Sequence, residues 1–97
     1  ASQQVLMVSG FTDDRPVRGG SRQFADNWEL SAQRALTVTR ALVDEGVPAS
    51  ALFAAAFGAE QPVASNADAQ GRAQNRRVEM APMARRPAAA TGAGRGG

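Results

Sequence analysis

Short apolar segments, separated by turn-forming residues, divide most of this sequence into five candidate elements. The run Val5–Val8 consists of residues common in strands and is followed at once by Ser9 and Gly10, which predicts a buried strand. Further along, apolar residues recur at the spacing of one helix face, at Leu30, Ala35, Val38 and Leu42. They predict a helix whose apolar stripe packs in the core.

Capping residues place the ends of this helix. Asp26 or Asn27 can cap its start, and Asp26 with Glu29 three residues later fits a variant of the capping box. Gly46 is a suitable residue just beyond the last turn, and Pro48 prevents continuation. We therefore expect a helix that starts at Asp26 or Asn27 and ends just before Gly46.

The second half of the chain predicts a strand, a short helix and a final strand. Ala51–Phe57 is ambiguous by periodicity, and we interpret it as a strand because it is too short for a typical helix and ends at Gly58. Asn66 can cap a short helix over residues 67–74, and Val78 starts the last strand. The order β-α-β-α-β predicts an α/β (α+β sandwich) domain, a mixed sheet with helices packed on it.

Two segments do not fit into these elements. The stretch 15–25 is rich in Pro, Gly, Arg and Ser and predicts a long loop, which is more often functional or mobile than short loops are. Residues 84–97 are Ala, Gly, Arg and Pro almost throughout and predict a disordered tail. The expected organisation is a domain over residues 1–83 followed by this tail.

Composition excludes several classes of site. The 97 residues include no cysteine and no histidine, which excludes zinc ribbons, disulfide scaffolds and histidine-based catalytic pairs. Residues 1–80 carry eight arginines against nine acids, a net charge of −1, whereas residues 81–97 carry three arginines and no acid. The basic charge thus belongs to the tail, which argues against a domain that follows a phosphate backbone. No signal peptide or membrane span is expected within this sequence.

Three motifs carry the remaining information: SGFTDDRP at 9–16, NWELSAQRA at 27–35 and GRAQNRRVE at 71–79. In this order and spacing they resemble the OmpA-like peptidoglycan-binding domain, whose hallmarks are G-x-T-D, N-x-x-L-S-x-x-R-A and N-R-R-V. The resemblance covers residues 5–80. Within that family, Trp28, the acid and proline after Asp13 and the long loop are most similar to the MotB-type flagellar stator branch. Phe11 departs from the family, since many members have histidine there.

The resemblance implies a ligand and its binding residues. The family binds the diaminopimelate of the peptide stem, which ends in an ammonium and a carboxylate. Asp13 would then bind the ammonium and Arg34 the carboxylate, in a bidentate pair. Further binding residues carried over from the family are Thr12, Asn27, Leu30, Ser31 and Arg76. It implies neither a metal nor a cofactor.

The resemblance also implies a function. It predicts a non-catalytic module that anchors a stator subunit to the wall, as the periplasmic domain of an inner-membrane protein. Its partners would be peptidoglycan, a second copy in a homodimer and a MotA-like protein contacted through a transmembrane part outside this sequence. The family domain normally opens with a further strand and helix, and we expect this sequence to begin after them. A sheet edge would therefore be exposed, and we expect marginal stability or self-association.

Other functions and simpler roles compete with this interpretation. The anchor of another OmpA-family outer-membrane protein or lipoprotein is the main alternative. A hydrolase using Asp13 and Asp14 is disfavoured because adjacent residues on a strand point to opposite faces, and a nucleic-acid-binding tail lacks aromatic residues for stacking. Asp13 could instead close an Asx-turn, and Arg34 could be solvated or be a structural partner of Asp13. We expect Trp28 to be a core or loop anchor and Gly10 to permit a close backbone approach.

Overall fold

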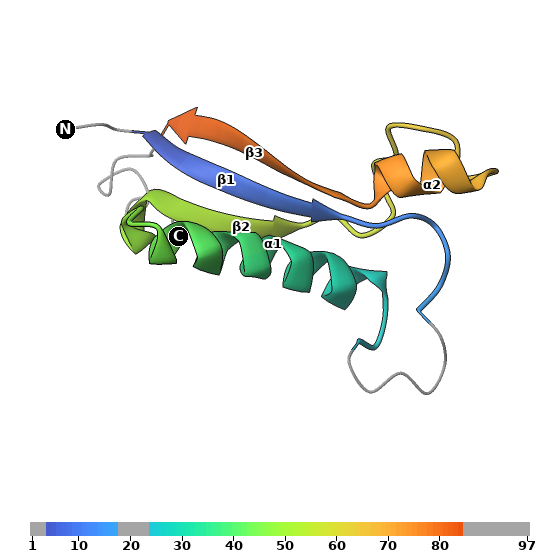
Figure 1. Ribbon diagram of the computed structural model, residues 1–97, viewed down its shortest axis with the longest axis horizontal. Coiled ribbons are helices and arrows are strands. Elements are labelled where there is room, and N and C mark those ends of the chain that lie inside the picture. Colours follow the sequence, from blue (N-terminus) through green and yellow to red (C-terminus); the bar gives the residue numbers. More distant parts are fainter. Residues whose placement is uncertain (1–3, 18–23, 85–97) are drawn as a thin grey trace, which may run out of the picture.

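The computed structural model describes residues 4–17 and 24–84, which form a three-stranded sheet with helices at its face and end (Figure 1). This confirms the predicted α/β class and the order of elements. The bounds are β1 Gln4–Phe11, α1 Asn27–Asp44, a 3₁₀ turn η1 Ala49–Ala51, β2 Leu52–Ala56, α2 Ala69–Asn75 and β3 Arg77–Ala84.

The sheet is mixed, with β1 in the centre and strand order β2-β1-β3. β1 runs parallel to β2 and antiparallel to β3, so Val8 lies opposite both Ala54 and Met80. At the end of β1, Phe11 is paired with Arg77 at the start of β3. The carboxyl ends of β1 and β2, the start of α1 and the end of α2 therefore meet at one edge of the sheet (Figure 1).

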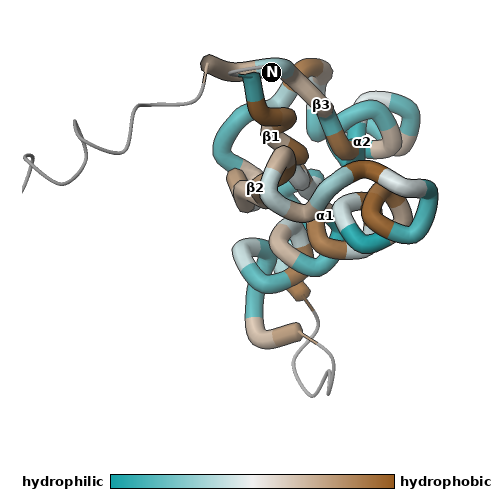
Figure 2. The backbone as a smooth tube through the Cα atoms, turned by 90° about the vertical axis from the view of Figure 1, so that its left-hand side faces the viewer, coloured by the Kyte–Doolittle hydropathy of each residue, from teal (hydrophilic) through white to brown (hydrophobic). Residues whose placement is uncertain are grey.

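Small residues let α1 pack closely on the sheet. A Cβ added to Gly10 would lie only 2.0 Å from the backbone oxygen of Ser31, so only glycine allows this approach. Val8 and Ala35 are fully buried in the same contact. This confirms the close approach predicted at Gly10. In the tube view, β1 with its brown hydrophobic segments lies between β2 and β3 (Figure 2).

The apolar stripe of α1 is less buried than expected. Leu30, Val38 and Leu42 are half-buried, whereas the buried hydrophobic core of the described residues consists of Val8, Phe11 and Ala35. The expectation that the three larger residues are core is thus met only in part. The reason is that one helix covers a three-stranded sheet, so the flanks of its apolar stripe remain open.

The ends of α1 follow the predicted capping pattern. The carboxylate of Asp26 accepts a hydrogen bond from the backbone N–H of Glu29 at 2.9 Å, so Asp26 and not Asn27 is the cap. The Glu29 carboxylate in turn accepts from the backbone N–H of Ala25 at 2.9 Å, much as in a capping box. Gly46 has φ of +109°, the conformation for which glycine was expected after the last turn.

The predicted cap of the second helix is wrong. α2 begins at Ala69, and its cap is Asp68, whose carboxylate accepts from the N–H of Gly71 at 2.7 Å. The side-chain oxygen of Asn66 instead accepts a hydrogen bond from Asn75 at 2.8 Å. Asn75 is fully buried at the end of α2, so it uses Asn66 as an internal partner.

The final strand is longer than the sequence suggested. β3 continues through Pro82. Its last residue is Ala84, which was predicted to belong to the tail and which pairs with Gln4.

Residues 85–97 and the centre of the 15–25 loop lie outside the described residues. Within the described ranges, no helix has the length and hydropathy needed to cross a bilayer. Phe53, Met80 and Met83 are 40–54% exposed on the sheet, consistent with an incompletely covered surface.

Candidate ligand-binding site

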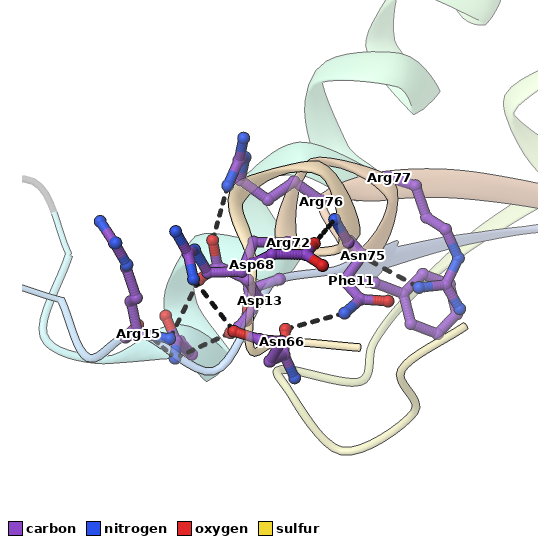
Figure 3. Close-up of polar contacts among 12 residues, drawn as sticks. Phe11, Asp13, Arg15, Asn66, Asp68, Arg72, Asn75, Arg76 and Arg77 are labelled. Atoms are coloured by element: carbon purple, nitrogen blue, oxygen red, sulfur yellow. Dashed lines mark hydrogen bonds and ion pairs between the residues drawn. The ribbon is translucent and has the colours of Figure 1, made fainter. Parts of the chain in front are cut away.

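A buried carboxylate lies directly after β1. The Asp13 side chain is only 10% exposed. One oxygen accepts the backbone N–H of Arg15 at 3.0 Å, which is the local turn expected of an aspartate here. The other oxygen pairs with Nη1 of Arg76 at 2.7 Å (Figure 3). Asp14, the next residue, is exposed, so the two carboxylates do not share one environment.

Backbone contacts hold this carboxylate in place. The N–H of Thr12 donates to the carbonyl of Gly58 at 2.9 Å, and its hydroxyl donates to the carbonyl of Asp13 at 2.8 Å. The Asn27 amide donates to the carbonyl of Arg15 at 3.0 Å and, more weakly, to that of Asp13 at 3.4 Å. Thr12 and Asn27, both predicted ligand contacts, thus fix the turn that presents Asp13.

Arg34 hydrogen-bonds the backbone of Phe11 and not the carboxylate of Asp13, its expected structural partner. Its Nη1 donates to the carbonyl of Phe11 at 3.0 Å, whereas the ion pair of Asp13 is with Arg76. Burial lowers the pKa of Arg34 from its ordinary value, the nearby charge of Arg76 lowers it further, and Asp13 opposes both. Arginine stays protonated in proteins, so Asp13, Arg34 and Arg76 form a charge cluster of net +1.

Burial alone would raise the pKa of Asp13, but other interactions outweigh it. The hydrogen bond from Arg76, the backbone hydrogen bond from Arg15 and the charges of these two arginines hold this pKa below its ordinary value. The ionised form is therefore the stable one in the folded chain. The result is an ionised carboxylate that is paired with Arg76 and feels the charge of Arg15, and it stays ionised at any pH near neutral.

The lowered pKa of Asp13 predicts an acid-sensitive contribution to stability. Because the folded pKa lies below the unfolded value of about 3.9, the contribution is fully present above pH ~4 and is lost as pH falls through the folded pKa. We expect the difference in unfolding free energy between wild type and Asp13→Asn to be constant from pH 5 to 8 and to shrink below ~4. Urea unfolding at each pH measures it. A difference that shrinks between pH 5 and 7 would contradict the pairing described above.

Ser31 lies inside the fold and not at the surface of the cluster. It is fully buried, its hydroxyl donates to the carbonyl of Trp28 at 3.0 Å, and it accepts the N–H of Gly58 at 2.9 Å. Leu30, another predicted ligand residue, is half-buried on α1. Ser31 thus joins the start of α1 to the turn after β2.

Sequence reasoning missed an aromatic and cationic stack behind the cluster. The ring of Phe11 lies parallel to that of Phe57, with centroids 5.1 Å apart. The guanidinium of Arg77 lies 3.8 Å from the centroid of the Phe11 ring and also donates to the carbonyl of Gln61 at 3.0 Å. This stack connects the ends of β1 and β2 to the start of β3, next to Arg76.

Asn75 was also missed and makes four hydrogen bonds. Its oxygen accepts the N–H groups of Val63 and Ala64 at 2.7 and 3.0 Å. Its nitrogen donates to the carbonyl of Ala64 and to the side chain of Asn66, at 2.9 and 2.8 Å (Figure 3). All four bonding positions of the amide are used. The segment before α2 is thus tied to the residue that precedes Arg76.

Trp28 was expected to be a core or loop anchor, and it packs on a loop without being buried in the core. It is 52% exposed, and the turn at Gly58 lies against its ring. Gly58 has φ of +59°, and a Cβ there would lie 3.2 Å from Cδ2 of Trp28. The indole therefore packs on one side and is open on the other.

In the residues that the structure describes, no three acidic side chains converge as a metal site would require.

Comparison with known proteins adds to this geometry. The model of the OmpA family matches residues 1–76. Motility protein B of Bacillus subtilis is 38% identical over 76 residues, 77% of this chain and 28% of that protein. The peptidoglycan-associated lipoprotein of Pseudomonas aeruginosa is 42% identical over 79 residues, 81% of this chain and 44% of that protein. This chain thus spans less than half of either relative.

A solved structure shows the same fold. The C-terminal domain of Helicobacter pylori MotB, residues 125–256, aligns with a TM-score of 0.80 and 32% identity. The alignment covers 89% of this chain and 64% of that one. About a third of the solved domain therefore has no counterpart in this chain.

Proposed function

We propose, on the premise that this chain belongs to the OmpA family, that it is a non-catalytic module that anchors its parent protein to the cell wall by binding peptidoglycan. The Pseudomonas relative is a peptidoglycan-associated lipoprotein, which supports this ligand. The observation that carries the proposal is the charge cluster at the end of β1, a buried anion paired with Arg76, whose charge also acts on Arg34.

The cluster suits the free end of diaminopimelate, where one carbon carries an ammonium and a carboxylate. An ionised carboxylate has about four acceptor positions, and Asp13 uses one toward Arg15 and one toward Arg76, which leaves positions for an ammonium. Arg34 and Arg76 supply guanidinium donors for the carboxylate. A ligand of balanced charge places its anion at the two arginines and its cation at Asp13.

Arg76 has a larger role in this proposal than was expected from the sequence. One guanidinium nitrogen of Arg76 pairs with the carboxylate of Asp13. The Arg76 side chain is 43% exposed, so its other N–H donors can face a ligand. Arg34 is more buried and is oriented by the carbonyl of Phe11. We assign the ligand carboxylate to both arginines. A single stem would bind weakly, because exposed ion pairs contribute about 0.2–1 kcal/mol each.

The parent protein we propose is a MotB-type stator subunit in the inner membrane, with this domain in the periplasm. Its proposed partners are a second copy and a MotA-like protein. The structural match to a MotB domain supports this parent. The similar identity to a peptidoglycan-associated lipoprotein favours a second candidate, the wall-anchoring domain of a lipoprotein. The sequence upstream separates them, since a stator has a transmembrane helix there and a lipoprotein has a lipidation site.

A titration with two stem peptides tests the proposed ligand. One peptide carries diaminopimelate at its third position and the other carries lysine, which has the ammonium but not the adjacent carboxylate. The diaminopimelate peptide is expected to bind at least about tenfold more tightly, because only it can pair with the two arginines. Isothermal titration calorimetry measures both. Equal affinities would show that the arginines do not select the ligand.

A further inference from the structure

The guanidinium of Arg77 is held by four groups behind the charge cluster. Its Nε pairs with the carboxylate of Glu79 at 2.6 Å. Its Nη1 donates to the carbonyl of Asn75 at 3.2 Å, and its Nη2 donates to the carbonyl of Gln61 at 3.0 Å. The same group lies 3.8 Å from the centroid of the Phe11 ring (Figure 3). Every guanidinium nitrogen has a partner and only 17% of the side chain is exposed, so Arg77 is fixed in place.

One of these contacts holds the peptide bond that precedes Arg76. The carbonyl of Asn75, which accepts from Arg77, belongs to that peptide bond. The N–H of the same peptide bond is that of Arg76, and it donates to the carbonyl of Arg72 at 3.1 Å. A peptide bond is planar, so bonding both of its polar atoms fixes the orientation of the whole plane. The backbone that carries Arg76 therefore cannot turn while Arg77 stays in place.

The direction of the Arg76 side chain follows from this backbone. Arg76 has φ of −80° and ψ of 91°, an extended conformation, and Arg77 begins β3 opposite Phe11. Side chains of successive residues in an extended chain point to opposite sides. With Arg77 held on the Phe11 ring, Arg76 is directed the other way, toward Asp13. The pair with Asp13 is the only hydrogen bond of the Arg76 side chain among the described residues, so its aim depends on the backbone.

We propose that Arg77 is a positioning residue that sets the selectivity of the charge cluster, because it aims Arg76 at the place of the ligand carboxylate beside Asp13. This inference rests on the proposed function, since it names what makes that site prefer diaminopimelate to lysine. Arg77 itself does not touch the ligand. A lysine cannot replace it, because an ammonium lacks the planar fork that bonds two carbonyls while lying on an aromatic ring.

The selectivity of Arg77→Lys tests the proposal. Wild type and variant are titrated calorimetrically with the diaminopimelate peptide and the lysine peptide. The affinity of the variant for the diaminopimelate peptide is expected to fall about fivefold and that for the lysine peptide not to fall, so the ratio drops from at least about tenfold to about twofold. Arg34 keeps its own hydrogen bond to Phe11, which is why the loss is partial. An unchanged ratio, or equal weakening with both peptides, would overturn the proposal.

The ionisation of Asp13 gives a second readout that needs no ligand. Burial raises the pKa of Asp13, and the hydrogen bond from Arg76 is the strongest of the interactions that lower it. Lysine at position 77 keeps the charge there, so a change in this pKa reports on the position of Arg76. The carboxyl carbon resonance of Asp13, followed by NMR against pH, is expected to show a higher pKa in Arg77→Lys. An unchanged pKa in the folded variant would refute the positioning role.

Two further variants complete the test. Arg72→Lys is the matched control, because Arg72 donates to a single carbonyl, that of Asn66, at 3.0 Å, and lysine can replace one such bond. It should change neither the selectivity nor the pKa of Asp13. If circular dichroism shows that Arg77→Lys does not fold, Phe11→Leu takes its place, since it removes the ring under Arg77 and keeps the backbone. Unchanged selectivity in folded Phe11→Leu would then overturn the proposal.

The failure of this inference differs from the failure of the proposed function. Wild type that binds both peptides equally would refute the proposed ligand, and with it the selectivity assigned to Arg77. Wild type that prefers diaminopimelate, with the same preference in folded Arg77→Lys, would leave the proposed function intact and refute the role of Arg77 alone. The two results come from the same titrations.

Discussion

Replacing Gly10 with alanine is expected to destabilise the fold by about 3 kcal/mol. The added Cβ would lie 2.0 Å from the carbonyl oxygen of Ser31 and 3.1 Å from the backbone nitrogen of Ala35. Both atoms belong to the backbone of α1, so no side chain can rotate away, and the helix must move off the sheet. Small domains have only about 5–15 kcal/mol of stability in total, so the loss is large. Urea unfolding followed by circular dichroism measures it.

Gly46→Ala is the matched control for this prediction. Gly46 has φ of +109° with no atom within 4 Å of an added Cβ, so alanine there causes backbone strain alone. We expect a loss of about 1–2 kcal/mol. Equal losses at the two positions would show that the contact between α1 and β1 is looser than described. A larger loss at Gly46 would contradict it outright.

The second large effect is expected on binding. Asp13→Asn keeps the shape of the side chain and an oxygen for the N–H of Arg15, but it removes the charge that would bind a ligand ammonium. Hydrogen bonds to charged groups contribute about 1.5–3 kcal/mol, so affinity for the diaminopimelate stem should fall at least about tenfold. The variant also leaves Arg76 without its anionic partner. Calorimetric titration measures the affinity.

The neighbouring acid provides the control. Asp14→Asn removes the same charge from an exposed position one residue away. A general electrostatic attraction would be weakened equally by both variants, whereas a specific contact is weakened only by Asp13→Asn. Circular dichroism spectra of both must match that of the wild type. Equal losses of affinity in the two folded variants would contradict a direct role for Asp13.

The sequence predicted those features that depend on neighbouring residues. The capping carboxylate of Asp26 and the positive φ of Gly46 follow from rules that act within one helical turn. Gly10 was identified because a glycine after a buried strand indicates a close approach. The second helix cap was placed at Asn66 and not at Asp68, because two suitable cap residues lie two positions apart and their local patterns are similar.

Contacts between segments that are distant in the sequence could not be predicted from local sequence patterns. The pair of Asp13 with Arg76 joins residues 63 positions apart, and it depends on the register in which Phe11 meets Arg77. The burial of Asn75 depends on how the loop before α2 folds back. Trp28 was expected to be an anchor because tryptophan is usually mostly buried, but here Gly58 covers only one face of its ring.

Co-sedimentation with purified sacculi tests the central claim most directly. Wild type, Asp13→Asn and Asp14→Asn are incubated with sacculi whose stems contain diaminopimelate, and the bound fraction is measured after centrifugation. Wild type and Asp14→Asn are expected to pellet with the sacculi, and folded Asp13→Asn to remain in solution. If folded Asp13→Asn pellets as well as the wild type, or if folded wild type does not pellet, the buried carboxylate at the end of β1 is not what anchors this domain to the wall.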